Sequence, residues 1–129
     1  MLEEILLSIN KKQWNLIKSG RKTVEVQKTK PQKMFYPFRV IVYVTGGIGV
    51  VGKFDCDEIR QTIRPEDFAK DSCLTADELY AYAAGNPICA WHIQEGSVVE
   101  YDFPFPLKIA TGFDTPPESW CYMNRDDDS

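Results

Sequence analysis

Long apolar runs are missing from this sequence: no stretch of its 129 residues approaches the roughly 20 apolar residues that cross a bilayer. The N-terminal letters MLEEILLSINKK also lack the basic leader, apolar core and small-residue cleavage site of a signal peptide. Both absences predict a cytoplasmic protein with no membrane partner. Hydrophobic residues at 43% and charged residues at 26% are close to the globular average, which argues against disorder.

Closely spaced cysteine pairs are missing as well. The four cysteines stand far apart, without the CxxC spacing typical of zinc sites: Cys56, Cys73, Cys89 and Cys121. We expect free thiols that pack as small apolar side chains, and no metal ion or other cofactor. Histidine occurs only once, as His92, and a Cys–His nucleophile pair needs a third, orienting group that the sequence does not identify. His92 is therefore interpreted as a half-buried structural residue.

Positive charge is in deficit overall but concentrated in one part of the chain. The formal net charge is −4. Residues 1–40 hold nine Lys and Arg against three acids, whereas residues 41–129 hold six against sixteen. This asymmetry predicts a local basic surface on an acidic body, so contacts with a polyanion should be confined to one face. A protein that coats duplex DNA is usually basic overall, which argues against duplex DNA as a partner.

The order of the expected elements indicates an α+β protein. Strands are predicted over residues 3–9, 22–28, 39–45, 50–60, 88–93, 98–101, 105–110 and 120–123. Helices are predicted over residues 11–19 and 65–72 and between Thr75 and Gly85, with Asn10 and Thr75 as N-caps and Gly20 and Gly85 as left-handed stops. We expect a small β-barrel of about five to seven strands with two or three helices. It forms one domain over residues 1–123, followed by an acidic tail, residues 124–129, that should fray.

Two motifs suggest ligand sites but have simpler explanations. The letters from Gly47 to Gly52 match the dinucleotide pattern GxGxxG, which requires a helix to begin there. Residues KFDCDEI follow instead at strand period, so a glycine-rich hairpin is the preferred interpretation. Asp55, Asp57 and Glu58 form an acidic cluster that a hard cation could occupy, with the first two on one strand face. A solvated strand face is the preferred interpretation of that cluster.

The stretch SGRKTVEVQK, residues 19–28, places a single carboxylate, Glu25, among the cations of the N-terminal part. As a strand it would turn its valines toward the core and Thr23, Glu25 and Gln27 to the other face. Lysines on an edge strand discourage aggregation, so a solvated edge strand is the simplest interpretation. That interpretation does not explain why the lone carboxylate lies at the middle of the polar face.

The same stretch resembles the GxKxxExR signature of the ASCH domain, a branch of the PUA-like β-barrel superfamily, in the letters GRKTVEVQ from Gly20 to Gln27. The surroundings agree: a strand of the type ILLSI, a short helix ending in SG, and the hairpin letters GVVGKF. The ending PPESWCYM is similar to that of some bacterial and phage members. The resemblance covers residues 3–123. It differs at Gln27, where the signature has an arginine, and a neutral amide cannot replace a guanidinium that pairs with phosphate or carboxylate.

The resemblance implies a cleft between the barrel and its helices, with Lys22 and Glu25 on its wall. A regular strand puts residues three positions apart on opposite faces. The two side chains can therefore share a site only if Lys22 lies in the bend after Gly20 or if a bulge twists the strand. A structure in which they point to opposite sides would refute this hypothesis. Lys28 follows Gln27 directly and would face away from it.

Two function classes follow from the resemblance. The first is a binding module for RNA or a nucleotide-like small molecule, since PUA-like barrels commonly recognise RNA or modified bases. Cations next to aromatic residues suit contacts with a nucleic-acid backbone and stacking on its bases. The expected contact residues are Arg21, Lys22, Thr23, Glu25, Gln27, Lys28, Lys30 and Tyr36, with Lys33, Phe35 and Phe38 nearby.

The second class is an enzyme, since a small bacterial ASCH protein is an amidohydrolase that removes the acetyl group from N4-acetylcytidine with a lysine, a threonine and a glutamate. Lys22 matches the lysine, Glu25 stands at the threonine position, and the glutamate would align near Ser72, beside Asp71. An enzyme would use Lys22 as nucleophile or base and Glu25 as proton shuttle. A deprotonated Lys22 would indicate this class and an ammonium the binding module. A protein-interaction module of a mobile element is a third alternative, without a signal in the sequence.

Overall fold

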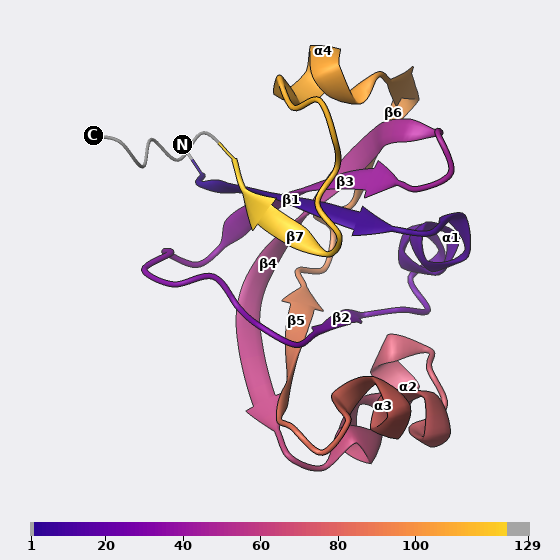
Figure 1. Ribbon diagram of the computed structural model, residues 1–129, viewed down its shortest axis with the longest axis vertical. Helices are drawn as coiled ribbons and strands as arrows, with labels where there is room; N and C mark the ends of the chain where they lie inside the picture. Colours follow the sequence, from indigo (N-terminus) through magenta and orange to yellow (C-terminus); the bar gives the residue numbers. More distant parts are fainter. Residues whose placement is uncertain (1, 124–129) are drawn as a thin grey trace.

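The strands of the molecule form one mixed sheet in a computed structural model that describes residues 2–123 (Figure 1). The strands are β1 (Glu4–Ile9), β2 (Val24–Gln27), β3 (Phe38–Val44), β4 (Gly49–Thr62), β5 (Ile88–Ile93), β6 (Val99–Phe105) and β7 (Trp120–Tyr122). Their order is β2-β5-β4-β3-β1-β7, with β6 paired to β4 outside this path. Strands β1 and β3 run parallel, and the other pairs are antiparallel. The predicted fraying of residues 124–129 concerns a tail that lies outside the described residues.

The sheet curls into a half-barrel, which confirms the predicted α+β class and its barrel-like form (Figure 1). Its outermost strands, β2 and β7, are not hydrogen-bonded to each other. Thr29, just after β2, links them instead. Its carbonyl oxygen accepts from the indole Nε1 of Trp91 at 3.2 Å, and its hydroxyl accepts from that of Trp120 at 2.8 Å. Thr29 thus accepts hydrogen bonds from one indole of β5 and one of β7, across the gap between β2 and β7.

The helices follow the capping residues that the sequence carries. They are α1 (Lys11–Ser19), a 3₁₀ turn (Pro65–Phe68) leading into α2 (Ala69–Ser72), α3 (Ala76–Ala83) and α4 (Leu107–Thr111). Asn10 accepts from the backbone N–H of Gln13 at 2.8 Å, and Thr75 forms the predicted capping box with Glu78. Helix α1 ends at Gly20, whose φ of 82° is left-handed. Both predicted N-caps are therefore confirmed.

Two element predictions need correction. Residues 105–110, predicted as a strand, are divided between the end of β6 and helix α4, which begins after Pro106 and ends before Gly112. A five-residue helix is too short to show a helical period, so its apolar letters look like a strand. Helix α3 ends at Ala83, because Ala84 already has the left-handed conformation expected first at Gly85. The glycine-rich hairpin between β3 and β4 is as predicted.

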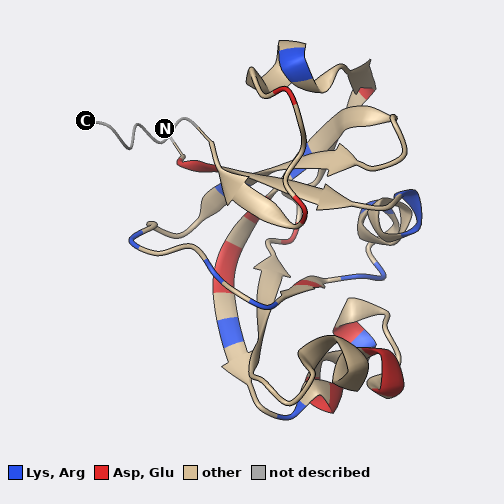
Figure 2. Cartoon of the chain, viewed as in Figure 1, with Lys and Arg blue, Asp and Glu red and all other residues tan. Residues whose placement is uncertain are grey.

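The charged side chains are unevenly placed on this frame (Figure 2). Lys and Arg follow α1 and the segments on either side of β2, whereas Asp and Glu mark the region of α2 and α3 and the middle of β4. The cations of the N-terminal part thus gather around the β2 edge of the sheet, next to acidic neighbours.

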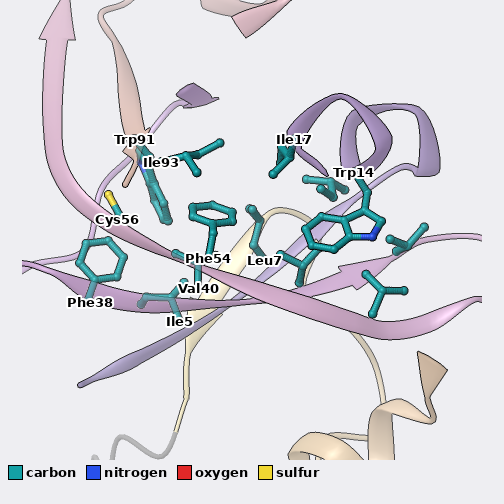
Figure 3. Close-up of a cluster of buried hydrophobic side chains, with 14 of the residues drawn as sticks. Ile5, Leu7, Trp14, Ile17, Phe38, Val40, Phe54, Cys56, Trp91 and Ile93 are labelled. Carbon is teal, nitrogen blue, oxygen red and sulfur yellow. The ribbon is translucent and has the colours of Figure 1, made fainter. Parts of the chain in front are cut away.

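Two apolar clusters cover the two faces of the sheet near that edge. The larger lies inside the half-barrel, where Phe38, Phe54 and Trp91 are fully buried and Trp14 and Ile17 close it from α1 (Figure 3). The second lies between β2, β5 and the helices, and contains Val24, Val26, Phe68, Leu79, Ala83, Ile88 and Ala90. Each large side chain buried in this way contributes about 1.5–3 kcal/mol to stability. Strand β2 is therefore held by packing on both faces.

Candidate functional site

Lys22 lies in the bend that the site hypothesis required. Helix α1 ends at Gly20, and β2 begins only at Val24, so the predicted strand over residues 22–28 is shorter at both ends. The Lys22 N–H donates to the carbonyl of Leu16 at 3.1 Å, which holds the residue against α1 instead of in the sheet. Strand alternation does not apply to a residue in a bend, so Lys22 and Glu25 are free to face each other.

Three polar side chains meet at this point, and we call Lys22, Glu25 and Gln27 the polar network. The Lys22 Nζ lies 3.2 Å from Oε1 of Glu25 and donates to the carbonyl oxygen of Ser72 at 3.1 Å. The Gln27 Nε2 donates to Oε2 of Glu25 at 2.7 Å. Both carboxylate oxygens of Glu25 are thus occupied. The structure brings Lys22 and Glu25 together, as the hypothesis demanded.

The polar network is buried, which corrects the interpretation of a solvated edge strand. The relative exposures of Lys22, Glu25 and Gln27 are 2%, 7% and 5%. Glu25 and Gln27 pair across the sheet with Trp91 and Cys89, so they share the face of the larger apolar cluster. Charges taken out of water are costly unless they are paired and hydrogen-bonded, and the network supplies both. The lone carboxylate of the basic stretch is there to neutralise a buried lysine.

A cleft of about 380 Å³ opens beside the polar network, between the end of α1 and the turn after β5. Its lining residues are Ile17, Gly20, Lys22, Thr23, His92, Ile93, Gln94, Glu95, Gly96 and Val98. Lys22 is thus on the cleft wall as expected, whereas Glu25, expected beside it there, is not a lining residue. The far wall is fixed by Ser97, whose hydroxyl accepts from the N–H of Asp55 at 2.9 Å and donates to the carbonyl of Gln94 at 2.7 Å. The cleft is therefore built from secondary structure and an anchored turn.

His92, on this cleft wall, has the orienting group that the sequence did not identify. Its Nδ1 lies 2.6 Å from Oδ1 of Asp57, and the two side chains are 38% and 32% exposed. The register of β4 against β5 shifts between Cys56 and Glu58, so Asp57 is the extra residue of a β-bulge. Asp57 is thus a partly exposed strand residue, as interpreted from the sequence, and in addition it contacts His92.

The neighbouring cysteine is not a nucleophile partner for His92. Burial raises the pKa of the Cys56 thiol to about 12, and the side chain is fully buried. A thiol in this state is inert, since the thiolate is the reactive form. Asp55 is also paired, at 3.2 Å from the Nζ of Lys53. Among residues 2–123 no group of three or more His, Cys, Asp or Glu side chains is placed to hold a metal ion.

The other predicted contact residues do not join the polar network. Arg21, Lys28 and Lys30 are exposed around it. Lys28 lies with its Nζ 4.9 Å from the centre of the Tyr82 ring, whose hydroxyl has a pKa raised by burial and then by the charge of Glu25. Tyr36 is 47% exposed, so it remains available for stacking. Of the nearby aromatic residues, Phe35 is 84% exposed and Phe38 is a core residue.

No family model matches the chain, and no curated protein matches it. Among solved structures, the crystal structure of ASCH from Zymomonas mobilis superposes with a TM-score of 0.78 at 20% sequence identity. The match covers 95% of this chain and 89% of that chain. The chain has the ASCH fold. Crystal structures of two single-substitution variants of the same Zymomonas mobilis protein give the same TM-score, over 89% and 91% of their length.

The ASCH fold confirms the architecture that the signature suggested, and its residue roles in this chain are proposals. Within this fold the resemblance placed a glutamate near Ser72. In the structure the backbone carbonyl of Ser72 accepts a hydrogen bond from Lys22. Ser72 is therefore next to the lysine, but its side chain has no carboxylate. Sequence reasoning missed both this carbonyl and the His92–Asp57 pair, because neither a backbone contact nor a bulge leaves a pattern in the letters. The described helices contain none that is long and apolar enough to cross a membrane.

Proposed function

We propose that this chain binds RNA or a nucleotide-like small molecule in the cleft beside the polar network. The observation that carries the proposal is a cleft of about 380 Å³ that is lined by the buried Lys22, which Glu25 pairs with at 3.2 Å. Small-molecule pockets typically measure about 300–1,000 Å³ and combine apolar walls with a few fixed polar groups. The cleft has the volume and lining for a nucleoside.

Polar groups on the cleft wall remain available to such a ligand. The Thr23 hydroxyl and the Gln94 side-chain amide make no hydrogen bond to other residues of the 2–123 segment, and both residues line the cleft. A hydroxyl and an amide each both donate and accept, which suits the mixed donors and acceptors of a base edge. A backbone hydrogen bond fixes the bend that carries Thr23, since the N–H of Thr23 donates to the Asp71 carbonyl at 2.8 Å.

The basic segment, which we define as Lys28, Lys30 and Lys33, follows β2 at the end of the strand opposite to the cleft. All three lysines are exposed, and Phe35 and Tyr36 follow them with exposed rings. Single-stranded RNA is typically bound by cations along its backbone and by aromatic rings that stack on its bases. This arrangement supports RNA as the ligand class, with one nucleotide in the cleft and a more distant part of the same strand on the basic segment.

The polar network favours binding over the amidohydrolase alternative. The Lys22 amine already donates to Glu25 and to the Ser72 carbonyl, whereas a nucleophile or base needs a free lone pair. Glu25 stands where the resemblance requires a threonine, and a carbonyl stands where it requires a carboxylate. Two of the three groups of that chemistry are therefore replaced.

The proposal is tested by amide-shift titration of the isotope-labelled chain with a short single-stranded RNA at low salt, and then with cytidine and N4-acetylcytidine. We expect shifts at Lys22, Thr23 and Gln94 with the nucleosides, and additional shifts over residues 28–36 with RNA that weaken as salt rises. Acetate release from N4-acetylcytidine would support the enzyme instead. Unchanged amides around the cleft with all three ligands would refute the proposal.

Loss of the basic segment is compared with loss of a single lysine elsewhere on the surface. Replacing the three lysines of the basic segment with Gln should reduce the salt dependence of RNA binding, by about 0.7 in log–log slope for each phosphate that is no longer neutralised. The control is Lys108→Gln, which removes an exposed lysine of α4 that is paired with Asp114. Equal slopes for the two variants would show that RNA does not bind along the basic segment.

A further inference from the structure

His92 lines the cleft and is paired with Asp57, which does not line it, and neither residue is part of the polar network. His92 Nδ1 and Asp57 Oδ1 are 2.6 Å apart, and His92 Nε2 has no hydrogen-bond partner in the described chain. His92 is a lining residue of the cleft and its side chain is 38% exposed, so solvent and small ligands can reach the imidazole. An imidazole with one nitrogen held by a partner and the other unpaired can distinguish ligands that donate a hydrogen bond from ligands that accept one.

Asp57 sets which nitrogen carries the proton. An ionised carboxylate only accepts hydrogen bonds, so a neutral imidazole must donate to it from Nδ1–H. The lone pair then lies on Nε2. A neutral His92 paired in this way therefore has its hydrogen-bond acceptor at Nε2.

From this geometry we infer that His92 determines specificity, by selecting ligands that present an N–H donor, such as the exocyclic amine of a nucleobase, to its Nε2. The inference rests on the proposed function, since it concerns a ligand of the same cleft. Asp57 is a positioning residue, because it acts on the ligand only through the imidazole.

The imidazole is held firmly enough to discriminate. His92 belongs to β5, which has β2 on one side and β4 on the other, and it stands opposite Val24 and Glu58. The bulge turns Asp57 toward it, which is a common use of bulges beside functional sites. A fixed acceptor loses little conformational entropy when a ligand binds. A ligand without a donor leaves this acceptor buried and unpaired, which lowers the binding affinity.

Local charge favours a donor over an anion at this point. Glu95 lines the same cleft, and Asp57 lies behind the imidazole. The cation of the cleft, Lys22, is neutralised by Glu25 at 3.2 Å. A partly positive amine hydrogen is therefore attracted to Nε2, whereas a phosphate there would meet acidic neighbours and belongs on the basic segment.

The test uses His92 as a spectroscopic probe, since it is the only histidine of the chain. Imidazole ¹⁵N spectra of the whole chain identify the protonated nitrogen directly. We expect a proton on Nδ1, and we expect cytidine to shift Nε2. N4,N4-dimethylcytidine, which keeps the ring but lacks the donor, should bind about three- to tenfold more weakly, as expected when one hydrogen bond is missing.

Two variants complete the test. His92→Phe should bind the two nucleosides equally, because the ring remains and the acceptor is gone. Asp57→Ala should populate both tautomers and reduce the preference, a readout that a merely structural role would not change. Amide spectra of each variant show whether the variant is folded. If a variant is unfolded, the tautomer of His92 in the unchanged protein still decides the inference.

Each outcome bears on the inference. A proton on Nε2 in the unchanged chain overturns it. Shifts at the amides of Lys22 and Thr23 without a change at Nε2 overturn it too, while leaving the proposed function intact. Shifts at Nε2 without those amides support His92 as an acceptor and contradict the proposed site. If neither Nε2 nor the amides of Lys22 and Thr23 shift with any nucleoside, the inference and the proposed function are both overturned.

Discussion

Glu25→Gln is the most informative single substitution, because it removes one charge of a buried pair and nearly preserves shape. At 3.2 Å and an effective dielectric constant of about 20, the attraction between Lys22 and Glu25 is about 5 kcal/mol. A glutamine still offers one oxygen to the ammonium, so part of the interaction survives. We expect a net loss of about 3 kcal/mol in the free energy of unfolding, within the range for a buried pair broken on one side.

The assay is urea unfolding followed by tryptophan fluorescence, since Trp91 reports on the core cluster that Glu25 faces. A loss of this size should lower the melting temperature by about 10 °C for a domain of this length. The matched control is Glu95→Gln, which makes the same chemical change on an exposed side chain. It should change the stability by less than about 0.5 kcal/mol.

A double-mutant cycle isolates the pair itself. Lys22→Met combined with Glu25→Gln removes both charges, so the double variant should be more stable than the sum of the single losses predicts, with a coupling of about 2 kcal/mol. If Glu25→Gln is as stable as its control, or if the two changes are simply additive, the buried network does not have the energetic role that its geometry indicates.

Three further outcomes follow from the fold. In Gly52→Ala the new Cβ would lie 2.1 Å from a backbone oxygen of β6, so we expect a loss of about 3 kcal/mol on urea unfolding, against about 1–2 kcal/mol for Gly46→Ala, where only a positive φ is strained. Thr75→Ala should lose about 1 kcal/mol in the same assay, because the capping box of α3 is broken. A thiol reagent at about pH 8 should modify the half-buried Cys73 well before Cys56, since burial raises the Cys56 pKa to about 12. The unfolded thiol ionises near 9.0, so stability from protonated Cys56 is complete below that pH and is lost as pH rises to about 12.

Each of these has a result that contradicts it. Equal losses for Gly52→Ala and Gly46→Ala would mean that β6 moves away at no cost. A Thr75→Ala variant as stable as the unchanged chain would mean that the cap adds nothing to α3. Early modification of Cys56 in the folded protein would show that the half-barrel interior opens readily. A Cys56→Ala variant whose stability falls just as steeply between pH 9 and pH 12 would assign that dependence to other groups.

The sequence predicted the parts of the fold that local chemistry controls. Asn10, Gly20 and Thr75 mark helix ends through hydrogen bonds to their own neighbours, so their positions can be predicted without knowledge of the tertiary structure. The bend at Lys22 was not predicted in this way: a strand was expected from residue 22, and the bend was named only as a condition of the site hypothesis. Helix α4 was missed because its five residues do not show a period, although Pro106 before it and Gly112 after it are ordinary boundary residues.

In the candidate site, too, contacts that depend on local structure were predictable and contacts that depend on tertiary packing were not. The meeting of Lys22 with Glu25 depends on a local bend, and it was predicted as a condition. The burial of Gln27, the carbonyl of Ser72 and the contact of Asp57 with His92 depend on which strands and helices pack together. Contacts between distant segments are fixed by tertiary packing, which a single sequence does not display.

The hydrogen bonds at Thr29 connect the intrinsic tryptophan fluorescence of the protein to the segment after β2. Two indoles, those of Trp91 and Trp120, donate to this one residue, and it stands between Lys28 and Lys30 of the basic segment. A strand of RNA that draws those lysines outward would stretch or break both hydrogen bonds. Indole emission responds to the loss of a hydrogen bond, so a ligand that displaces Thr29 would change the native fluorescence of the unlabelled protein.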